Sequence, residues 1–469
     1  MTTDYTMTAK IKHFLLVSML IVSVTLISAD RLGAQVFKTL YTFTNNIGSN
    51  PVGGLVLSGN VLYGMTGSGG GGGQGAVFAV NTDGTGFTNL YTFTAGRDGA
   101  DPYNGLILSG NTLYGSAQGN VSSYTIFKLN TDGTGFTNIA DLPGPLTLMV
   151  SGNTLFGAAA TATDSLLFHV NTDGSGYENL YAFTANIFGY PYDFGTNSDG
   201  ATPYGALVLS GDTLYGTASS GGLAGNGTVF KVGTNGGGFL VLHTFTACSG
   251  IGNDGTNSDG AGPGAVILLG DSLYGTTSYG GSSSNGTVFK IRTDGSGFTV
   301  LHTFTSDSKS FSYGLSLSGS TLYGTTDYND LAGTGTVYAL NTDGSGFTVL
   351  HSFPAISGPN TINSGGAGPF GGLTLSGNTV YGTTLVGGSG GGGTIFSISL
   401  PPQLAITASG PNVVLTWPTN VAGLTLQSTP NLVSPVVWTP VSPGPVVVNG
   451  LNTVTNPMIG SQQFYRLSQ

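Results

Sequence analysis

The chain has 469 residues, of which 81 are glycine and only 7% are charged, and its formal net charge is −10. So few Glu, Lys and Arg residues exclude long solvent-exposed helices, and 11 Lys and Arg are too few for a basic surface that binds nucleic acid. A hydrophobic content of 39% excludes a disordered chain, so we expect an all-β protein with a large core.

The first 34 residues have the layout of a secretory signal peptide. A basic stretch ending at His13 precedes an apolar run, Phe14–Ala29, which is shorter than the about 20 residues of a membrane-spanning helix. We expect cleavage near Ala34, with cleavage after Ala29 as the alternative, and a secreted or cell-envelope protein. A membrane anchor is the less favoured interpretation, and no later apolar run is long enough to cross a bilayer.

A repeat of about 53 residues fills residues 35–400. Its anchor is an aromatic residue followed by glycine, usually within Leu-Tyr-Gly, and the aromatic positions are Tyr63, Tyr114, Phe156, Tyr215, Tyr274, Tyr323 and Tyr381. A period near 50 is typical of a four-stranded propeller blade. In the fifth repeat the four expected strands, a to d, are Ala265–Leu269, Ser272–Thr277, Thr287–Arg292 and Phe298–Phe304.

The turns of the repeat follow two patterns. Gly followed by Asn, Asp or Ser joins strand a to strand b, which suits a tight hairpin. Asn-Thr-Asp-Gly-Thr/Ser-Gly joins strand c to strand d, as in Asn81–Gly86 and Asn341–Gly346. This spacing has some likeness to calcium loops, but the terminal Glu is absent. We interpret the pattern as a hairpin turn and expect no cofactor, with calcium as the one candidate.

The two ends of the repeat region are complementary. The seventh repeat stops at Pro401 without its strand d, whereas Phe37–Phe43 matches strand d and has no strand a, b or c before it. We expect Phe37–Phe43 to pair antiparallel with Gly393–Ser399, which closes a seven-bladed β-propeller of four-stranded blades and removes two exposed sheet edges.

Residues 401–469 differ in composition from the repeats. They contain ten of the 20 prolines and both tryptophans, Trp417 and Trp438. Short strand-like runs between proline-rich turns predict a small β-sandwich similar to fibronectin type III. We expect the tryptophans in its core, since a small sandwich needs large anchors, whereas an exposed tryptophan would indicate carbohydrate binding.

The units with Leu-Tyr-Gly-Thr-Thr, Gly-Thr-Val-Phe-Lys and Asn-Thr-Asp-Gly-Ser-Gly-Phe resemble the GloVer tandem repeat of secreted bacterial "choice-of-anchor" proteins. The resemblance covers about residues 36–400. It implies export, repeat architecture and a variable C-terminal attachment region, but no shared activity. Neither a sortase-type motif nor a hydrophobic tail with basic residues is present at this C-terminus.

No set of reactive residues interrupts the repeat. His243, His302 and His351 occupy a strand-d position that Tyr holds in other repeats, so we interpret them as structural. The single Cys248 allows neither an internal disulfide nor a cysteine-based metal site. We therefore predict no catalytic residue and no metal ligand.

The b–c and d–a connections leave a blade on one face, and they vary in length and composition. The longest d–a loops, Ala185–Pro203 and Ala247–Pro263, share Gly-Thr-Asn-Ser-Asp-Gly-Ala. Variable loops on a rigid scaffold are where binding usually resides, although neutral loop drift is an equal alternative. The candidate contacts are Tyr190, Tyr192, Asp193, Asp199, Tyr204, Asp254, Asp259, Tyr279, Asp327 and Tyr328.

The leading hypothesis is a monomeric, non-catalytic interaction protein that binds an extracellular glycan, protein or cell-surface polymer. One alternative is a propeller hydrolase or lyase that acts on polysaccharide, with or without calcium, through Asp193, Asp199, Asp254 and Asp259. The other is a passive structural component of the envelope.

Overall fold

The computed structural model describes residues 35–44, 48–119, 123–144, 146–160, 165–185, 195–203, 205–249, 255–305, 314–327, 335–356, 362–400, 404–418, 424–431, 436–448, 451–457 and 463–468. Every regular element among them is a β-strand, so the expected all-β class is confirmed. The described part contains no helix that is long and apolar enough to cross a membrane. The signal-peptide prediction lies outside these residues.

The chain divides into a repeat unit, Phe37–Leu375 with Val380–Ile398, and a second unit that includes Ser399–Gln469.

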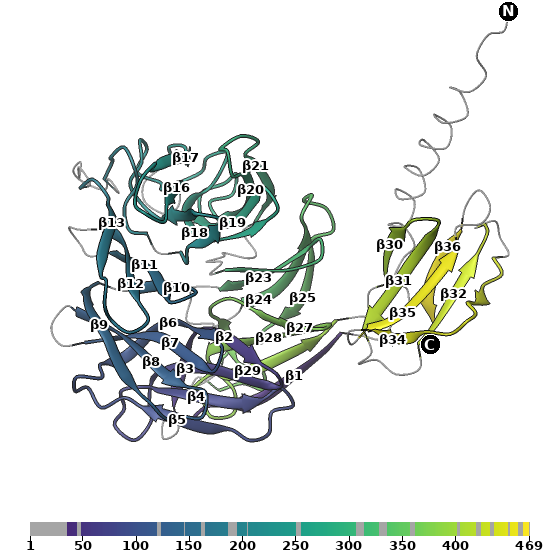
Figure 1. The fold of residues 1–469 in the computed structure, drawn as a ribbon, viewed down its shortest axis with the longest axis horizontal. Helices are drawn as coiled ribbons and strands as arrows, with labels where there is room; N and C mark the ends of the chain where they lie inside the picture. Colours follow the sequence, from purple (N-terminus) through teal and green to yellow (C-terminus); the bar gives the residue numbers. More distant parts are fainter. Residues whose placement is uncertain are drawn as a thin grey trace, which may run out of the picture. The chain divides into compact units, whose positions relative to one another are not determined.

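In the repeat unit, successive four-stranded antiparallel sheets follow one another around a common centre (Figure 1). Their strands, sheet by sheet, are β2 (Ser49–Ser58), β3 (Val61–Ser68), β4 (Ala76–Asn81) and β5 (Thr88–Thr92); β6 (Ala100–Ser109), β7 (Thr112–Gln118), β8 (Ser123–Asn130) and β9 (Thr137–Pro143); β10 (Leu146–Ser151), β11 (Thr154–Ala160), β12 (Ser165–Asn171) and β13 (Glu178–Ala182); β14 (Val208–Ser210), β15 (Thr213–Ala218), β16 (Thr228–Gly233) and β17 (Leu240–Thr244); β18 (Ala261–Leu269), β19 (Ser272–Tyr279), β20 (Thr287–Arg292) and β21 (Thr299–Thr303); β22 (Leu315–Ser318), β23 (Thr321–Asp327), β24 (Gly335–Asn341) and β25 (Thr348–Ser352). Within each sheet these strands are the expected strands a to d in order.

A further sheet combines both ends of the repeat region. It contains β26 (Ala367–Pro369), β27 (Thr374–Ser376), β28 (Thr379–Val386), β29 (Thr394–Ser399) and β1 (Val36–Thr42). β1 lies next to β29, and the Phe43 N–H donates to the Gly393 carbonyl at 2.9 Å. In the first sheet, Phe93 and Gly75 make the same bond at 3.1 Å. The predicted pairing of the N-terminal strand with the last repeat is therefore confirmed.

The repeated Leu-Tyr-Gly motif reflects a close approach inside each sheet. A Cβ on Gly64 of β3 would lie 2.5 Å from the ring of Phe78 on β4, and a Cβ on Gly275 would lie 2.4 Å from the ring of Phe289. Both rings are fully buried. The glycine on strand b thus leaves room for the aromatic ring of Gly-Thr-Val-Phe on strand c, which explains why the two motifs recur together.

At one end of each sheet, the a–b and c–d turns are joined by a hydrogen bond. In the first sheet the Thr82 N–H donates to the Asn60 carbonyl at 2.8 Å. Within the c–d turn, Asp83 Oδ1 accepts bonds from the Thr85 N–H and hydroxyl at 2.8 and 2.7 Å. These bonds lower the pKa of the exposed Asp83 carboxyl. The interpretation of this pattern as a hairpin turn is therefore confirmed.

Neighbouring sheets are held together by flat ring stacks. Tyr41 on β1 stacks on Phe87, which follows the c–d turn of the next sheet, with ring centres 3.8 Å apart and planes 4° apart. The same contact recurs in the pairs Tyr91–Phe136, Tyr181–Phe239, His243–Phe298, His302–Phe347 and His351–Phe37. A histidine can replace tyrosine here because both offer a flat ring, which supports the structural interpretation of these histidines.

Strand β1 contributes a ring to two of these stacks. Phe37 stacks on His351 of β25, and Tyr41 stacks on Phe87 of the first sheet. One core cluster also joins Tyr381 and Ile395 of the last sheet to Phe78 of the first. The last sheet therefore packs directly against the first.

The second unit contains two further sheets. The first comprises β30 (Ala405–Ser409), β31 (Asn412–Pro418), β35 (Leu451–Pro457) and β34 (Val446–Val448), and the second comprises β33 (Thr439–Pro440), β32 (Thr425–Thr429) and β36 (Phe464–Ser468). Trp417, Leu426 and Leu467 share one core cluster, to which both sheets contribute.

Trp417 is 1% exposed, as expected. The expectation for Trp438 was wrong, because this side chain is half-buried and lies outside the core cluster. It precedes the edge strand β33, where only one side is covered.

We predict that Phe37→Ala lowers the free energy of unfolding by about 2 kcal/mol, because the half-buried ring loses its contacts with His351 and the perpendicular ring of Phe353. Deleting residues 35–44 should cause a larger loss and aggregation, since β29 becomes an open edge. Urea unfolding and light scattering measure both effects. Val349→Ala is the control, because Val349 is 45% exposed. An unchanged midpoint and clear solution after the deletion would contradict a closing role for β1.

Candidate functional site

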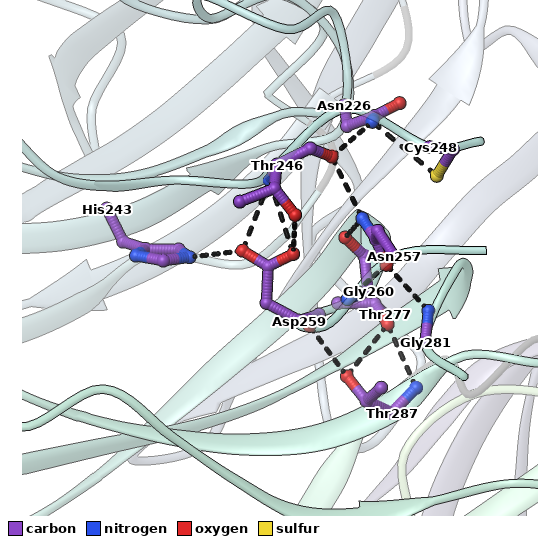
Figure 2. Close-up of polar contacts among 10 residues, drawn as sticks. All are labelled: Asn226, His243, Thr246, Cys248, Asn257, Asp259, Gly260, Thr277, Gly281 and Thr287. Carbon is purple, nitrogen blue, oxygen red and sulfur yellow. Dashed lines mark hydrogen bonds and ion pairs between the residues drawn. The ribbon is translucent and has the colours of Figure 1, made fainter.

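The b–c and d–a loops leave the sheets at the end opposite the tight turns. In the fifth sheet they are tied together by Asn257 (Figure 2). Its side-chain amide donates to the carbonyls of Thr246 and Gly260 at 2.9 and 2.8 Å, and its oxygen accepts the N–H groups of Gly260 and Gly281 at 2.9 and 2.7 Å. One side chain thus joins the chain after β17, the d–a loop and the following b–c loop.

Asp259, two residues further on, fixes the same loop to strand d (Figure 2). Its carboxylate accepts a bond from His243 Nε2 at 3.0 Å and from the Thr246 N–H and hydroxyl. Its own carbonyl accepts a bond from the Thr287 hydroxyl at 3.1 Å. Burial by itself raises the pKa of the Asp259 carboxyl, but the bonds from His243 and Thr246 outweigh burial and lower it. The carboxylate is therefore held ionised inside a satisfied network.

The same arrangement recurs in two other d–a loops, and we call it the d–a anchor: a Tyr or His on strand d, a Thr three residues later, and an Asp that binds both. Asp199 accepts bonds from Tyr181 and Thr184, and Asp98 accepts bonds from Tyr91 and Thr94. The Thr and Asp are 4 residues apart in the Asp98 anchor, 15 in the Asp199 anchor and 13 in the Asp259 anchor. The anchor is constant while the segment that it closes changes in length.

The structure places four of the ten candidate contacts. Asp199 and Asp259 are 4% and 5% exposed and belong to d–a anchors, so their carboxylates face protein groups. Tyr279 is half-buried at the end of β19, and burial with the nearby Cys248 raises its pKa to about 12. Asp327 is half-buried at the end of β23. The other six lie outside the described residues: Tyr190, Tyr192, Asp193, Tyr204, Asp254 and Tyr328.

Asp259 and Tyr279 are brought into one neighbourhood. Both interact electrostatically with the half-buried Cys248, whose pKa is raised mainly by burial. The Cys248 sulfur also accepts a 3.6 Å hydrogen bond from Asn226 (Figure 2). A thiol with a raised pKa is a weak nucleophile at neutral pH. Within the described residues, no group of three or more His, Cys, Asp and Glu side chains could hold a metal ion.

The sequence analysis did not identify the structural asparagines of these loops. Besides Asn257, they are Asn197 and Asn363, which make equivalent bonds to Gly222 and Gly388. Their signal is present in the repeated Asn-Ser-Asp-Gly and in Asn-Ser-Gly-Gly at Asn363–Gly366. The sequence alone does not distinguish such an asparagine from the neighbouring aspartate, because both residue types suit a solvated turn.

We predict that Asn257→Ala destabilises the protein by about 2 kcal/mol, because it leaves the Gly260 and Gly281 N–H groups without their acceptor. Hydrogen exchange of these two amides should accelerate more than exchange in the strands. The matched control is Ser258→Ala, since Ser258 is the exposed neighbour. Equal unfolding midpoints for the two variants would show that the asparagine is dispensable.

A second prediction concerns pH. Burial lowers the pKa of His351, and its Nε2 has no hydrogen-bond partner among the residues that the structure describes. The unfolded chain therefore takes up a proton below about pH 6.5 before the folded chain does, so stability falls as pH falls through that range. His351→Phe should keep the stack on Phe37 and reduce this loss. Denaturant unfolding from pH 7.5 to 5 measures it, and an unchanged slope for the variant would refute the prediction.

Comparison with known proteins identifies the repeat. One solved structure of similar fold is that of oligogalacturonate lyase in complex with manganese, which is 10% identical in sequence. The match covers 80% of this chain and 99% of the lyase chain, with a TM-score of 0.49. A putative 6-phosphogluconolactonase from Bacteroides uniformis is similar at 14% identity, covering 87% and 100%, with a TM-score of 0.45. Likeness of this degree carries no argument about activity, and none of the curated proteins matches the chain in sequence.

The model of the Gloeobacter/Verrucomicrobia repeat matches residues 151–310 and 252–420, more than half of the chain. The resemblance of the repeated motifs is thereby confirmed, and the chain belongs to the Gloeobacter/Verrucomicrobia repeat family.

Proposed function

We propose that this protein is a secreted, non-catalytic binding protein whose b–c and d–a loops bind an extracellular glycan, protein or surface polymer. One observation carries the proposal: the d–a anchor is the same in three loops, although its Thr and Asp are 4, 15 or 13 residues apart in the sequence. A fixed base lets the inserted segment change without disturbing the sheets. Variable loops on a rigid base are the usual arrangement of a recognition surface.

The proposed scaffold is a closed seven-bladed propeller, followed by a fibronectin-III-like sandwich over residues 401–469. The pairing of β1 with β29 and the packing of Tyr381 near Phe78 support closure, because they cover the first and last sheets. Closure fixes the positions of all the loops at one end of the scaffold. A ligand can then contact several loops without ordering them, which favours affinity.

Export is part of the proposal. The support is the basic stretch and apolar run before Ala34. We further propose that the mature protein acts as a monomer, because the last sheet packs against the first, so that neither sheet leaves this face open to another copy.

The hydrolase alternative, with or without calcium, requires carboxylates that reach a substrate. Asp199 and Asp259 belong to separate anchors, and each accepts bonds from its own strand d. Removing either from its anchor would leave Thr184 or Thr246 without its partner. The binding function needs neither carboxylate to be free, so we favour it.

The test uses mature protein, residues 35–469, screened against glycans and envelope fractions. We expect saturable binding that the triple variant Tyr190→Ala, Tyr192→Ala, Asp193→Asn weakens at least about tenfold, because aromatic and charged contacts dominate recognition surfaces. The matched control is Tyr177→Ala, which removes a 43% exposed tyrosine next to a c–d turn at the opposite end. Full binding by the triple variant would refute the proposed face, and no saturable binding would favour the passive envelope role. Stoichiometric calcium together with chelator-sensitive polysaccharide turnover would favour the enzyme.

A further inference from the structure

A row of three side chains crosses the outer face of the sheet β33-β32-β36 in the second unit. Gln427 on β32 pairs with Arg466 on β36, and Trp438 directly precedes β33. Leu426 and Leu467, the adjacent pair, point into the core. Because side chains alternate along a strand, Gln427 and Arg466 point away from the core. The row therefore lies on the solvent side of the sheet.

The guanidinium of Arg466 is held by two contacts. Its carbon lies 4.4 Å from the centre of the Trp438 ring, and its Nε donates to Gln427 Oε1 at 2.8 Å. Arg466 itself is exposed, and no carboxylate forms an ion pair with it among the described residues. The terminal nitrogens of the Arg466 guanidinium therefore still have N–H groups that can donate hydrogen bonds to another molecule. An arginine already oriented in this way loses less conformational entropy when it binds.

The charge distribution of the chain favours a negatively charged ligand at this site. Residues 401–469 contain no Asp, Glu, Lys or His, so Arg466 is their only charged side chain. Residues 37–398 contain 19 Asp and Glu against 7 Lys and Arg, so the repeat unit repels anions. An anion therefore meets a positive side chain on this sheet, and residues 401–469 contain no acidic side chain that competes for it. The planar guanidinium matches a carboxylate with two parallel hydrogen bonds.

The tryptophan adds a second requirement. Trp438 is half-buried and the Arg466 guanidinium lies over its indole ring, so the part of the ring that the guanidinium leaves uncovered is the flat apolar surface offered to a ligand. The C–H face of a pyranose ring packs on such a surface by dispersion. Thr425 lies two residues before Gln427 on the same outer face and is exposed, so its hydroxyl can bond to a sugar hydroxyl. A sugar ring that carries a carboxylate meets all these groups at once.

We propose that Trp438, Gln427 and Arg466 form a binding site for a carboxylated polysaccharide, separate from the loops of the repeat unit. The site gives the second unit a function of its own. It attaches the protein to a uronate-containing polymer through one sugar ring at a time.

The experiment measures binding of polygalacturonate by the mature protein, residues 35–469, in 0.15 M NaCl, with dextran as the neutral comparator. Binding should change the fluorescence of Trp438, because the other tryptophan, Trp417, is 1% exposed. Trp438→Ala and Arg466→Gln should each weaken binding at least about tenfold. Arg466→Lys should also weaken it, since lysine keeps the charge but lacks the planar fork. Arg97→Gln, which removes an exposed arginine from the repeat unit, is the matched control and should bind normally.

Unfolding midpoints within about 2 °C of wild type show that the variants remain folded. The proposal is overturned if polygalacturonate does not bind, if dextran binds equally well, or if Trp438→Ala and Arg466→Gln leave binding intact. It is also overturned if the triple loop variant at Tyr190, Tyr192 and Asp193 abolishes polygalacturonate binding. That result would place the anion on the repeat unit, whereas failure of the loop proposal alone leaves this site unaffected.

Discussion

Each sheet of the repeat unit is apolar on both faces, so it needs a neighbouring sheet on each side. The flat stack of a strand-d ring on the phenylalanine of the next sheet meets this need near the outer strands, as in Tyr41 on Phe87. Buried residues such as Leu62 and Phe78 meet it in the middle. An open row of such sheets would leave two apolar faces in water. The N-terminal strand resolves this constraint, because it completes the last sheet and stacks on both of its neighbours.

This constraint explains which residues the repeats keep and which they change. A ring at the stacking position must be flat, but it can be Tyr or His, because its tip forms a hydrogen bond to the anchoring aspartate in either case. Where that bond is missing, as at His351, the ring still stacks. The glycine after the Leu-Tyr pair admits no such exchange, since any Cβ would overlap the ring on strand c. Packing therefore sets the repeat more strictly than hydrogen bonding does.

The two ends of the repeat unit follow different rules for the same reason. At the end with the a–b and c–d turns, short hairpins with their own internal hydrogen bonds allow almost no insertion. At the other end, the d–a anchor satisfies the backbone where the loop leaves and re-enters the sheets, so the segment between can lengthen without loss of core packing. Residues 401–469 contain a single charged side chain, Arg466, and its guanidinium is held in a fixed position by stacking on an indole.

The sequence by itself determined the all-β class, the repeat and its strands, the turn types, and the pairing of β1 with β29, because each depends on local patterns or on a strand missing from one end and present at the other. The buried roles of Asp199 and Asp259 were decided only by the tertiary structure. Their Tyr, His and Thr partners lie on the preceding strand d, and an aspartate within a polar loop is equally compatible with a solvent-exposed ligand. The same holds for Asn257, which joins three segments.

Composition also could not separate Trp417 from Trp438, because burial depends on whether a second sheet covers the ring. Trp417 lies in a core cluster to which both sheets contribute, whereas Trp438 precedes an edge strand and is contacted by Arg466.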